Sequence, residues 1–230
     1  MADIKKVKPA ADYPPEEGCY LRGNDYSPVA VVVILRWRRE QTPADIENLV
    51  RVGVESGAAL AGTLQTENIG IEKIICNVVS NPNVRYLVIC GPESPGHLVG
   101  DAILALARNG LDDRKHIIRA EAPTPFLFNV RPEFVKRFRD QITVIDLVNE
   151  GSPEVIRQAV WSCYQEKPTL FGKYELYDPG AYPAEPLSGK ITWKVTQPSL
   201  KPKSDEEHAQ REKIQNLVER IKQAADKRHA

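Results

Sequence analysis

Two kinds of apolar pattern alternate along the chain. Short, continuous runs rich in β-branched residues are typical of strands buried on both faces of a parallel sheet. Between these runs, apolar residues recur at the spacing of helices with one buried face. The predicted strands span residues 29–35, 84–90, 116–118 and 142–147, and the predicted helices span 42–54, 67–79, 98–109, 132–139 and 152–165. This alternation predicts an α/β fold with a doubly wound, mainly parallel sheet and helices on both faces.

The flanking segments show different patterns. Residues 1–26 are charged and proline-rich without sustained periodicity, which predicts an N-terminal arm beside an α/β domain at 27–166. Prolines and glycines interrupt residues 167–203, so this part is predicted to be an extended segment, with an edge strand or hairpin arm at 190–195. Residues 204–230 predict a charged amphipathic helix capped by Ser204.

Charge and cysteine usage narrow the class of protein. The formal net charge is zero, so no global field would recruit nucleic acid or an anionic membrane. The four cysteines form no Cys-x-x-Cys pair, and Cys76 and Cys90 lie in apolar runs, which indicates buried thiols in a reducing compartment. No apolar run approaches the roughly 18 residues that a membrane span requires. We therefore expect a cytoplasmic protein without a transmembrane segment.

The loop that follows the strand at 84–90 is the candidate site. Ligands of open α/β sheets bind at the carboxyl ends of the strands, where this sequence has Gly-Pro-Glu-Ser-Pro-Gly-His at 91–97. Gly91 and Gly96 copy the glycine spacing of a phosphate-binding loop. However, His97 and Leu98 replace its Lys and Ser/Thr, and two prolines remove backbone donors, which excludes a nucleotide triphosphatase. A zinc site is also disfavoured, because only Glu93 lies near His97 in the sequence.

Two interpretations of His97 remain open at this point. His97 and Gly100 form the His-x-x-Gly half of the corrinoid-binding pattern Asp-x-His-x-x-Gly, in which imidazole coordinates cobalt and the glycine lets the corrin ring approach. The position of the Asp is Pro95 here, so the full pattern is absent. Alternatively, His97 caps a helix or forms a hydrogen bond within the loop.

Several ordered blocks of sequence, taken together, resemble a known family. They are Ser-Pro-Val-Ala at 27–30, Gly-Ala-Ala-Leu-Ala-Gly at 57–62, Thr-Glu-Asn-Ile-Gly-Ile-Glu-Lys at 66–73, Ser-Asn-Pro-Asn at 80–83, and Cys-Gly-x-Glu-x-x-Gly-His at 90–97. Over roughly residues 12 to 165 the chain resembles the A subunit of tetrahydromethanopterin S-methyltransferase, which is the corrinoid-bearing component of a methyl-transfer complex.

The resemblance implies a fold, a cofactor and a function. It implies a Rossmann-like domain at 27–166 that binds a cobamide (cobalamin), with His97 as axial ligand to cobalt. The chain would be a methyl carrier whose cobalt cycles between Co(I) and methyl-Co(III), served by an acceptor methyltransferase and by a methyl-donor methyltransferase subunit. Because the motif's Asp is missing, Glu93 is the expected partner that orients His97.

Further cofactor contacts are expected at two places. Backbone N–H groups at Thr66, Glu67, Asn68 and Gly70, before a predicted helix, could hold the amides or phosphate of the cobamide, with simple helix capping as the alternative. In the loop itself, the expected contacts are Gly91, Glu93, Gly96 and Gly100.

Two departures from the family pattern qualify the function. Family members in the membrane complex end in a transmembrane helix, whereas this sequence ends in a proline-rich segment and a charged amphipathic pattern, and residues 36–43 look like an insertion. A homologue without that membrane helix is therefore expected. The alternative function is a cofactor-free assembly or regulatory subunit of a methyltransferase complex.

Overall fold

The computed structural model describes residues 6–36, 42–191 and 209. Residues 6–191 all belong to one compact unit. Apart from residue 209, the predicted C-terminal helix at 204–230 lies outside the described residues. The same is true of most of the predicted strand at 190–195 and most of the predicted insertion at 36–43. None of the helices in the described ranges combines the length and the apolar character that a membrane span requires.

The centre of the unit is a five-stranded sheet. Its spatial order is β1 (Tyr20–Arg22), β3 (Leu60–Leu64), β2 (Val29–Ile34), β4 (Tyr86–Gly91) and β5 (Thr143–Val148). The strands β3, β2, β4 and β5 pair in parallel, and β1 is an antiparallel edge strand. The predicted α/β architecture with a mainly parallel sheet is therefore confirmed.

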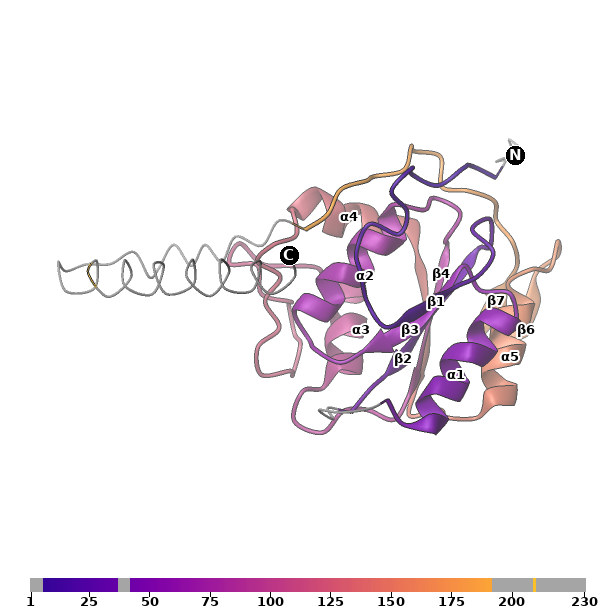
Figure 1. Ribbon diagram of the computed structural model, residues 1–230, viewed down its shortest axis with the longest axis horizontal. Helices are drawn as coiled ribbons and strands as arrows, with labels where there is room; N and C mark the ends of the chain where they lie inside the picture. Colours follow the sequence, from indigo (N-terminus) through magenta and orange to yellow (C-terminus); the bar gives the residue numbers. More distant parts are fainter. Residues whose placement is uncertain (1–5, 37–41, 192–208, 210–230) are drawn as a thin grey trace, which may run out of the picture. The chain divides into compact units, whose positions relative to one another are not determined.

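Helices cover both faces of this sheet (Figure 1). The helices α2 (Ile69–Val79), α3 (Val99–Asn109) and α4 (Pro132–Gln141) pack on one face, and α1 (Ala44–Glu55) and α5 (Pro153–Ser162) pack on the other. Local signals start several of them: the side chains of Asn68 and Ser152 cap α2 and α5, and a proline begins α4 and α5.

The strand β2 shows why both faces need cover. Its side chains alternate between the two apolar cores, with Val32 packing against α2 and α3 and Val33 packing on the side of α1 and α5. All six residues of β2 are buried. Burying a side chain of this size contributes about 1.5–3 kcal/mol, so a charge on either face of β2 would disrupt the fold.

The chain connections of β2 and β4 diverge at one edge of the sheet. From β2 the chain leads to α1 on one face, whereas from the neighbouring strand β4 it leads to α3 on the other face. In sheets with such diverging connections, ligands bind at the carboxyl ends of the two strands. The loop at 91–98 follows β4 and therefore lies at this edge of the sheet.

Some elements differ from the sequence prediction. The strand β3 was not predicted, because its Leu-Ala-Gly-Thr-Leu lacks a β-branched run. The strand predicted at 116–118 is wrong: His116 and Ile117 form only isolated bridges, with Phe126 and Leu111, in the connection between α3 and α4. The segment after α5 contains a small hairpin, β6 (Thr169–Phe171) and β7 (Tyr174–Leu176), that was also not predicted.

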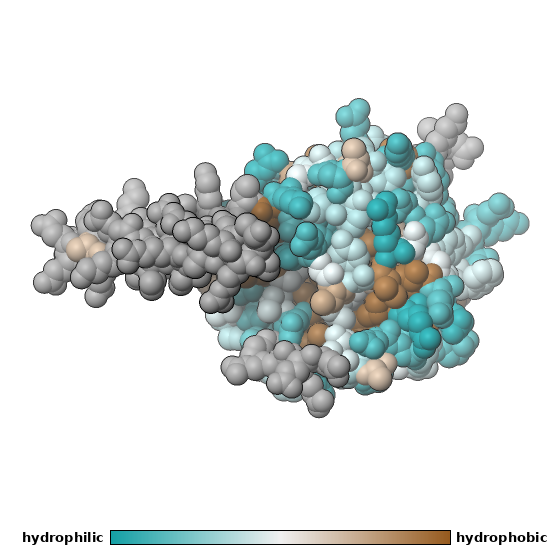
Figure 2. Space-filling view, viewed as in Figure 1, coloured by the Kyte–Doolittle hydropathy of each residue, from teal (hydrophilic) through white to brown (hydrophobic). Residues whose placement is uncertain are grey.

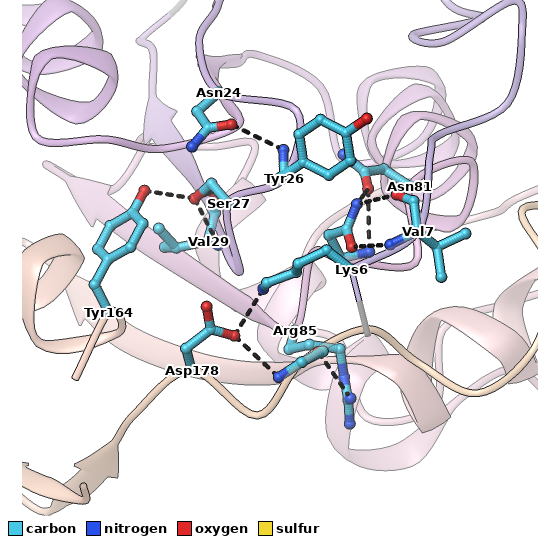
Figure 3. A network of polar contacts seen from close by, with 12 residues as sticks. Lys6, Val7, Asn24, Tyr26, Ser27, Val29, Asn81, Arg85, Tyr164 and Asp178 are labelled. Atoms are coloured by element: carbon cyan, nitrogen blue, oxygen red, sulfur yellow. Dashed lines mark hydrogen bonds and ion pairs between the residues drawn. The ribbon is translucent and has the colours of Figure 1, made fainter. Parts of the chain in front are cut away.

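A polar network closes the amino ends of the strands, at the edge opposite the 91–98 loop (Figure 3). Lys6 forms an ion pair with Asp178 at 2.7 Å, and the hydroxyls of Ser27 and Tyr164 share a hydrogen bond of 2.7 Å. Asn83 donates to the Val7 carbonyl at 2.6 Å. These contacts attach residues 6–27 and the segment after α5 to the edge of the sheet that lies away from His97.

Candidate functional site

His97 lies in a tight turn between β4 and α3. The amides of His97 and Leu98 both donate to the Ser94 carbonyl, at 3.3 and 2.9 Å. Gly96 has a φ of 87°, a conformation that side chains rarely adopt, and Leu98 has a φ of 47°. The turn thus brings the chain into α3 directly after His97 and leaves the imidazole 44% exposed.

Glu93 caps helix α3 and does not contact His97. Its carboxylate accepts hydrogen bonds from the backbone N–H groups of Ser94, Gly100 and Asp101 at 2.7, 3.0 and 2.9 Å. These donors include the free amides at the helix N-terminus, where a negative charge is favoured. The prediction that Glu93 orients His97 is therefore wrong, because both oxygens of Glu93 face the first turn of α3.

Gly100 is required by this cap. A Cβ atom at Gly100 would lie 2.6 Å from Oε2 of Glu93 and 2.7 Å from Cδ1 of Ile34. The missing side chain therefore makes room for the Glu93 carboxylate against the sheet. Gly91, the last residue of β4, is also buried, with a φ of 90°.

The partner of His97 is Glu67, which comes from the segment before α2. The Nδ1 atom of His97 lies 3.1 Å from Oε2 of Glu67, and the two residues are 30 positions apart. The Glu67 side chain is only 2% exposed, in contrast to the half-exposed imidazole. The structure thus pairs a buried carboxylate with a histidine that faces outward.

The second oxygen of Glu67 has its own donor. The hydroxyl of Thr124, in the connection between α3 and α4, donates to Oε1 of Glu67 at 2.6 Å. Burial alone would raise the pKa of Glu67, but hydrogen bonds from Thr124, from its own backbone and from His97 outweigh burial and lower the pKa. Glu67 is therefore an ionised acceptor at neutral pH.

This arrangement determines which nitrogen of His97 is available. An ionised carboxylate can only accept a hydrogen bond, so in the neutral imidazole Nδ1 carries the proton and Nε2 keeps its lone pair. Among the described residues, no protein group bonds to Nε2 of His97, and no three His, Cys, Asp or Glu side chains form a metal-binding group. The structure thus leaves one imidazole nitrogen that could bind a metal, on a partly exposed ring supported by a carboxylate, an arrangement found behind many metal-bound histidines.

The residues around the start of α2 act as caps. The Asn68 side chain accepts from the Ile69 amide at 2.7 Å, and the Thr66 hydroxyl accepts from the Gly70 amide at 2.9 Å. The bond from Gly70 uses one of the backbone N–H groups that were expected to hold a cobamide. Capping is therefore observed for Thr66 and Asn68, and cofactor contact at Thr66, Glu67, Asn68 and Gly70 stays a prediction.

An apolar cleft lies elsewhere on the face of the sheet that α2 and α3 cover. It has a volume of about 110 Å³ and lies between β1, β3 and α2, lined by residues such as Tyr20, Leu60 and Ile74 but not by His97. Figure 2 shows apolar residues gathered over β1 and β3. His97 is thus not part of this cleft.

Thr124 is the residue of this site that could not be identified from the sequence, whereas His97 was predicted and Glu67 was included for a different role. Thr124 lies 57 positions from Glu67, between two prolines in a segment without regular structure. No local motif signals its contact. Only the folding of the connection between α3 and α4 onto α2 brings these residues together.

Known proteins that are similar to this chain agree with the resemblance. Residues 6–192 match the family model described as the A subunit of tetrahydromethanopterin S-methyltransferase. The chain is 38% identical over 169 residues to the protein named as the first A subunit of this enzyme from Methanothermobacter thermautotrophicus, an alignment that covers 73% of this chain and 66% of that relative. It is 40% identical over 173 residues to the first A subunit from Methanobrevibacter ruminantium, covering 74% of this chain and 65% of the relative.

A third relative aligns over nearly the whole chain. The A subunit from Methanococcus maripaludis is 35% identical over 231 residues, which covers 98% of this chain and 87% of that protein. The chain thus spans just under two thirds of the length of the first two relatives and most of the third. From these matches, the chain belongs to the family formed by the A subunits of tetrahydromethanopterin S-methyltransferase.

Proposed function

We propose that this protein carries a cobamide and serves as a methyl carrier in methyl transfer, with His97 as the axial ligand to cobalt. The observation that carries the proposal is the polarised histidine: Nδ1 of His97 is bonded to the buried carboxylate of Glu67 while the imidazole remains 44% exposed. The residues fit this cofactor, because a corrin ring supplies its own equatorial nitrogens and needs only one axial ligand from the protein.

The protein's own residues would hold and orient the ligand. A bound cobamide would supply a cobalt centre that can accept and release a methyl group. Glu67 keeps the proton of His97 on Nδ1, so that Nε2 offers a neutral lone pair to the metal. Glu93 and Gly100 fix the start of α3 and thereby the turn from which His97 projects.

The family suggests partners and the finer fold. The relatives are named as subunits of tetrahydromethanopterin S-methyltransferase, and we propose that this chain likewise works with an acceptor methyltransferase and with a methyl-donor methyltransferase subunit. We further propose that residues 27–166 form a Rossmann-like, corrinoid-binding domain. The divergence of the chain from β2 and β4 to opposite faces supports this assignment.

The test is anaerobic reconstitution of the full chain with hydroxocobalamin, followed by absorbance spectra. We expect the native protein to show a histidine-ligated spectrum and His97→Ala to lose it, and added imidazole to restore it in the variant because it fills the vacated axial position. His229→Ala, a change near the end of the sequence, is the control and should match the native protein.

A spectrum that does not depend on His97 would contradict the proposed ligand. If the native chain also retained no cobalamin on gel filtration, the cofactor-free assembly or regulatory subunit would be the better description. Circular dichroism of each variant checks that the fold is intact.

A further inference from the structure

Thr124 is an exposed residue whose hydroxyl bonds to a buried carboxylate. It donates to Oε1 of Glu67 at 2.6 Å, across 57 positions of sequence. An exposed threonine loses little if its hydroxyl bonds to water instead, so Thr124 itself gains little from this contact. Glu67 is different, because a buried carboxylate needs a donor on each oxygen.

The segment that carries Thr124 is attached to the two helices of the site. On one side, the Glu121 amide donates to Asp101 of α3 at 2.7 Å. On the other side, the amide and the side chain of Asn129 donate to the buried Glu72 of α2, at 2.7 and 2.9 Å. The connection therefore holds Thr124 between the helix that follows His97 and the helix that follows Glu67.

The backbone next to Thr124 is also constrained. Prolines at 123 and 125 restrict the chain on both sides, and the Phe126 amide donates to the Thr124 carbonyl at 2.9 Å. The Ile117 amide in turn donates to the Pro125 carbonyl at 2.9 Å. The hydroxyl is thus presented to Glu67 from a fixed position.

We propose that Thr124 is a positioning residue for His97, acting through Glu67; this inference rests on the proposed role of His97 as a cobalt ligand. By holding Oε1, Thr124 fixes the plane of the carboxylate, so that Oε2 stays in line with Nδ1 of His97. Loss of the hydroxyl frees the carboxylate to rotate, and the imidazole loses its fixed direction. Outer partners of this kind tune the ligand without touching the metal.

The experiment compares Thr124→Val, Thr124→Ser and the native full chain after reconstitution with cobalamin. Valine has the shape of threonine without the donor, and serine keeps the donor. Thr143→Val, at an exposed position in β5, is the matched control. The readouts are the rate of cobalamin release and the electron paramagnetic resonance spectrum of the reduced, cobalt(II) form. For this spectrum the protein is also produced in cells fed histidine labelled with nitrogen-15. The label changes the splitting caused by the axial nitrogen only if that nitrogen belongs to histidine.

We expect Thr124→Val to release cobalamin roughly 3–10-fold faster and to show a smaller histidine-ligated fraction, while Thr124→Ser and Thr143→Val match the native protein. An unchanged ligated fraction and release rate in Thr124→Val would overturn the inference. If Thr124→Val does not fold, Thr124→Ala takes its place, and failure of both to fold would show a structural role and also overturn it. A native chain without a histidine-ligated signal would instead defeat the proposed function.

Discussion

Glu67 and His97 share one hydrogen bond between a buried and an exposed side chain. Glu67 is 2% exposed and ionised, so it cannot exchange its donors for water without cost. His97 is open to solvent on its other side and can take a further ligand. The same contact would be an ordinary surface ion pair if both groups were exposed, and it would then do little to orient the ring.

The first prediction at the residue scale concerns the charge of Glu67. Glu67→Gln keeps the size of the side chain but removes the charge that polarises His97, so we expect cobalamin affinity to fall about 10-fold while binding remains measurable by titration. Glu121→Gln, at an exposed carboxylate, is the control and should bind as the native protein does. Equal affinity of Glu67→Gln and the native chain would mean that the carboxylate does not tune the ligand.

The second prediction at this scale concerns the four thiols. Cys19 is exposed, whereas Cys76, Cys90 and Cys163 are buried. Burial, with smaller effects of nearby acidic groups, raises the pKa of each buried thiol to about 12, and only thiolates react quickly. We expect iodoacetamide at about pH 8 to label Cys19 alone in the folded protein and all four thiols in denaturant. Mass spectrometry of peptides gives the answer, and rapid native labelling of Cys90 would contradict the described core.

The predictability of the site differs from residue to residue. His97 could be found from the sequence, because its loop follows an apolar run and such loops form the ligand edge of a parallel sheet. The contact between Glu67 and His97 could not be found, because these residues are 30 positions apart. The contact between Glu67 and Thr124 spans 57 positions. Glu93 was given the wrong role because it is near His97 in sequence but faces the amides of α3.

At the scale of elements, the start of α3 depends on two side chains of the preceding loop, Glu93 and Ser94, whose hydroxyl accepts from the Val99 amide at 3.3 Å. The residue before α3 is Leu98, which offers no side-chain cap, and Glu93 supplies the missing acceptor from five positions upstream. A charged acceptor at helix amides forms stronger bonds than a neutral one. The turn that holds His97 is therefore closed by the cap at one end and by α3 at the other.

Gly100→Ala tests this cap. The added Cβ would lie 2.6 Å from Glu93 and 2.7 Å from Ile34, so the carboxylate must move away from the helix amides. Overpacking of this kind costs about 1–3 kcal/mol, which lowers the melting temperature of a chain of this size by several degrees. Gly151→Ala is the control, because nothing lies within 4 Å of a Cβ there. Calorimetry compares them, and equal melting temperatures would exclude the cap as described.

The strand β3 shows why an element can escape prediction from sequence. A Cβ at Gly62 would lie 2.6 Å from Cβ of Tyr20, and a Cβ at Gly53 of α1 would lie 2.9 Å from Cβ of Ala61. The small residues of β3 thus allow β1 and α1 to approach closely. Because this close packing requires small residues, β3 lacks the β-branched residues from which a strand is normally predicted. The strands β2 and β4 contain such residues.

At the scale of the whole molecule, the site draws on one face of the sheet. The helices α2 and α3 and the connection that carries Thr124 all pack into the same apolar core, while α1 and α5 form a separate core behind the sheet. Changes on α5, such as at the exposed Trp161, are therefore remote from the His97 turn. The network at the amino ends, with Lys6 and Asp178, is likewise at the opposite edge.

The buried thiols make global stability depend on pH in the alkaline range. In the folded state Cys76, Cys90 and Cys163 have pKa values raised to about 12 by burial, whereas an unfolded thiol ionises at about 8.5. Between these values the unfolded chain has released protons that the folded chain retains, so the free energy of unfolding falls as pH rises. We expect the urea midpoint to be steady near about pH 7 to 8 and to decline above about pH 8.5.

Two cysteine variants test whether the thiols cause this fall in the free energy of unfolding. Cys19 is exposed, so Cys19→Ser should leave the slope of unfolding free energy against pH unchanged. Cys90 is fully buried, so Cys90→Ala removes one of the raised ionisations. It should lower stability at neutral pH through the small cavity it leaves, yet it should make the alkaline decline shallower. A decline equally steep in Cys90→Ala would assign the pH dependence to other buried groups, of which Tyr86, with a pKa raised to about 12 by burial, is the first to examine.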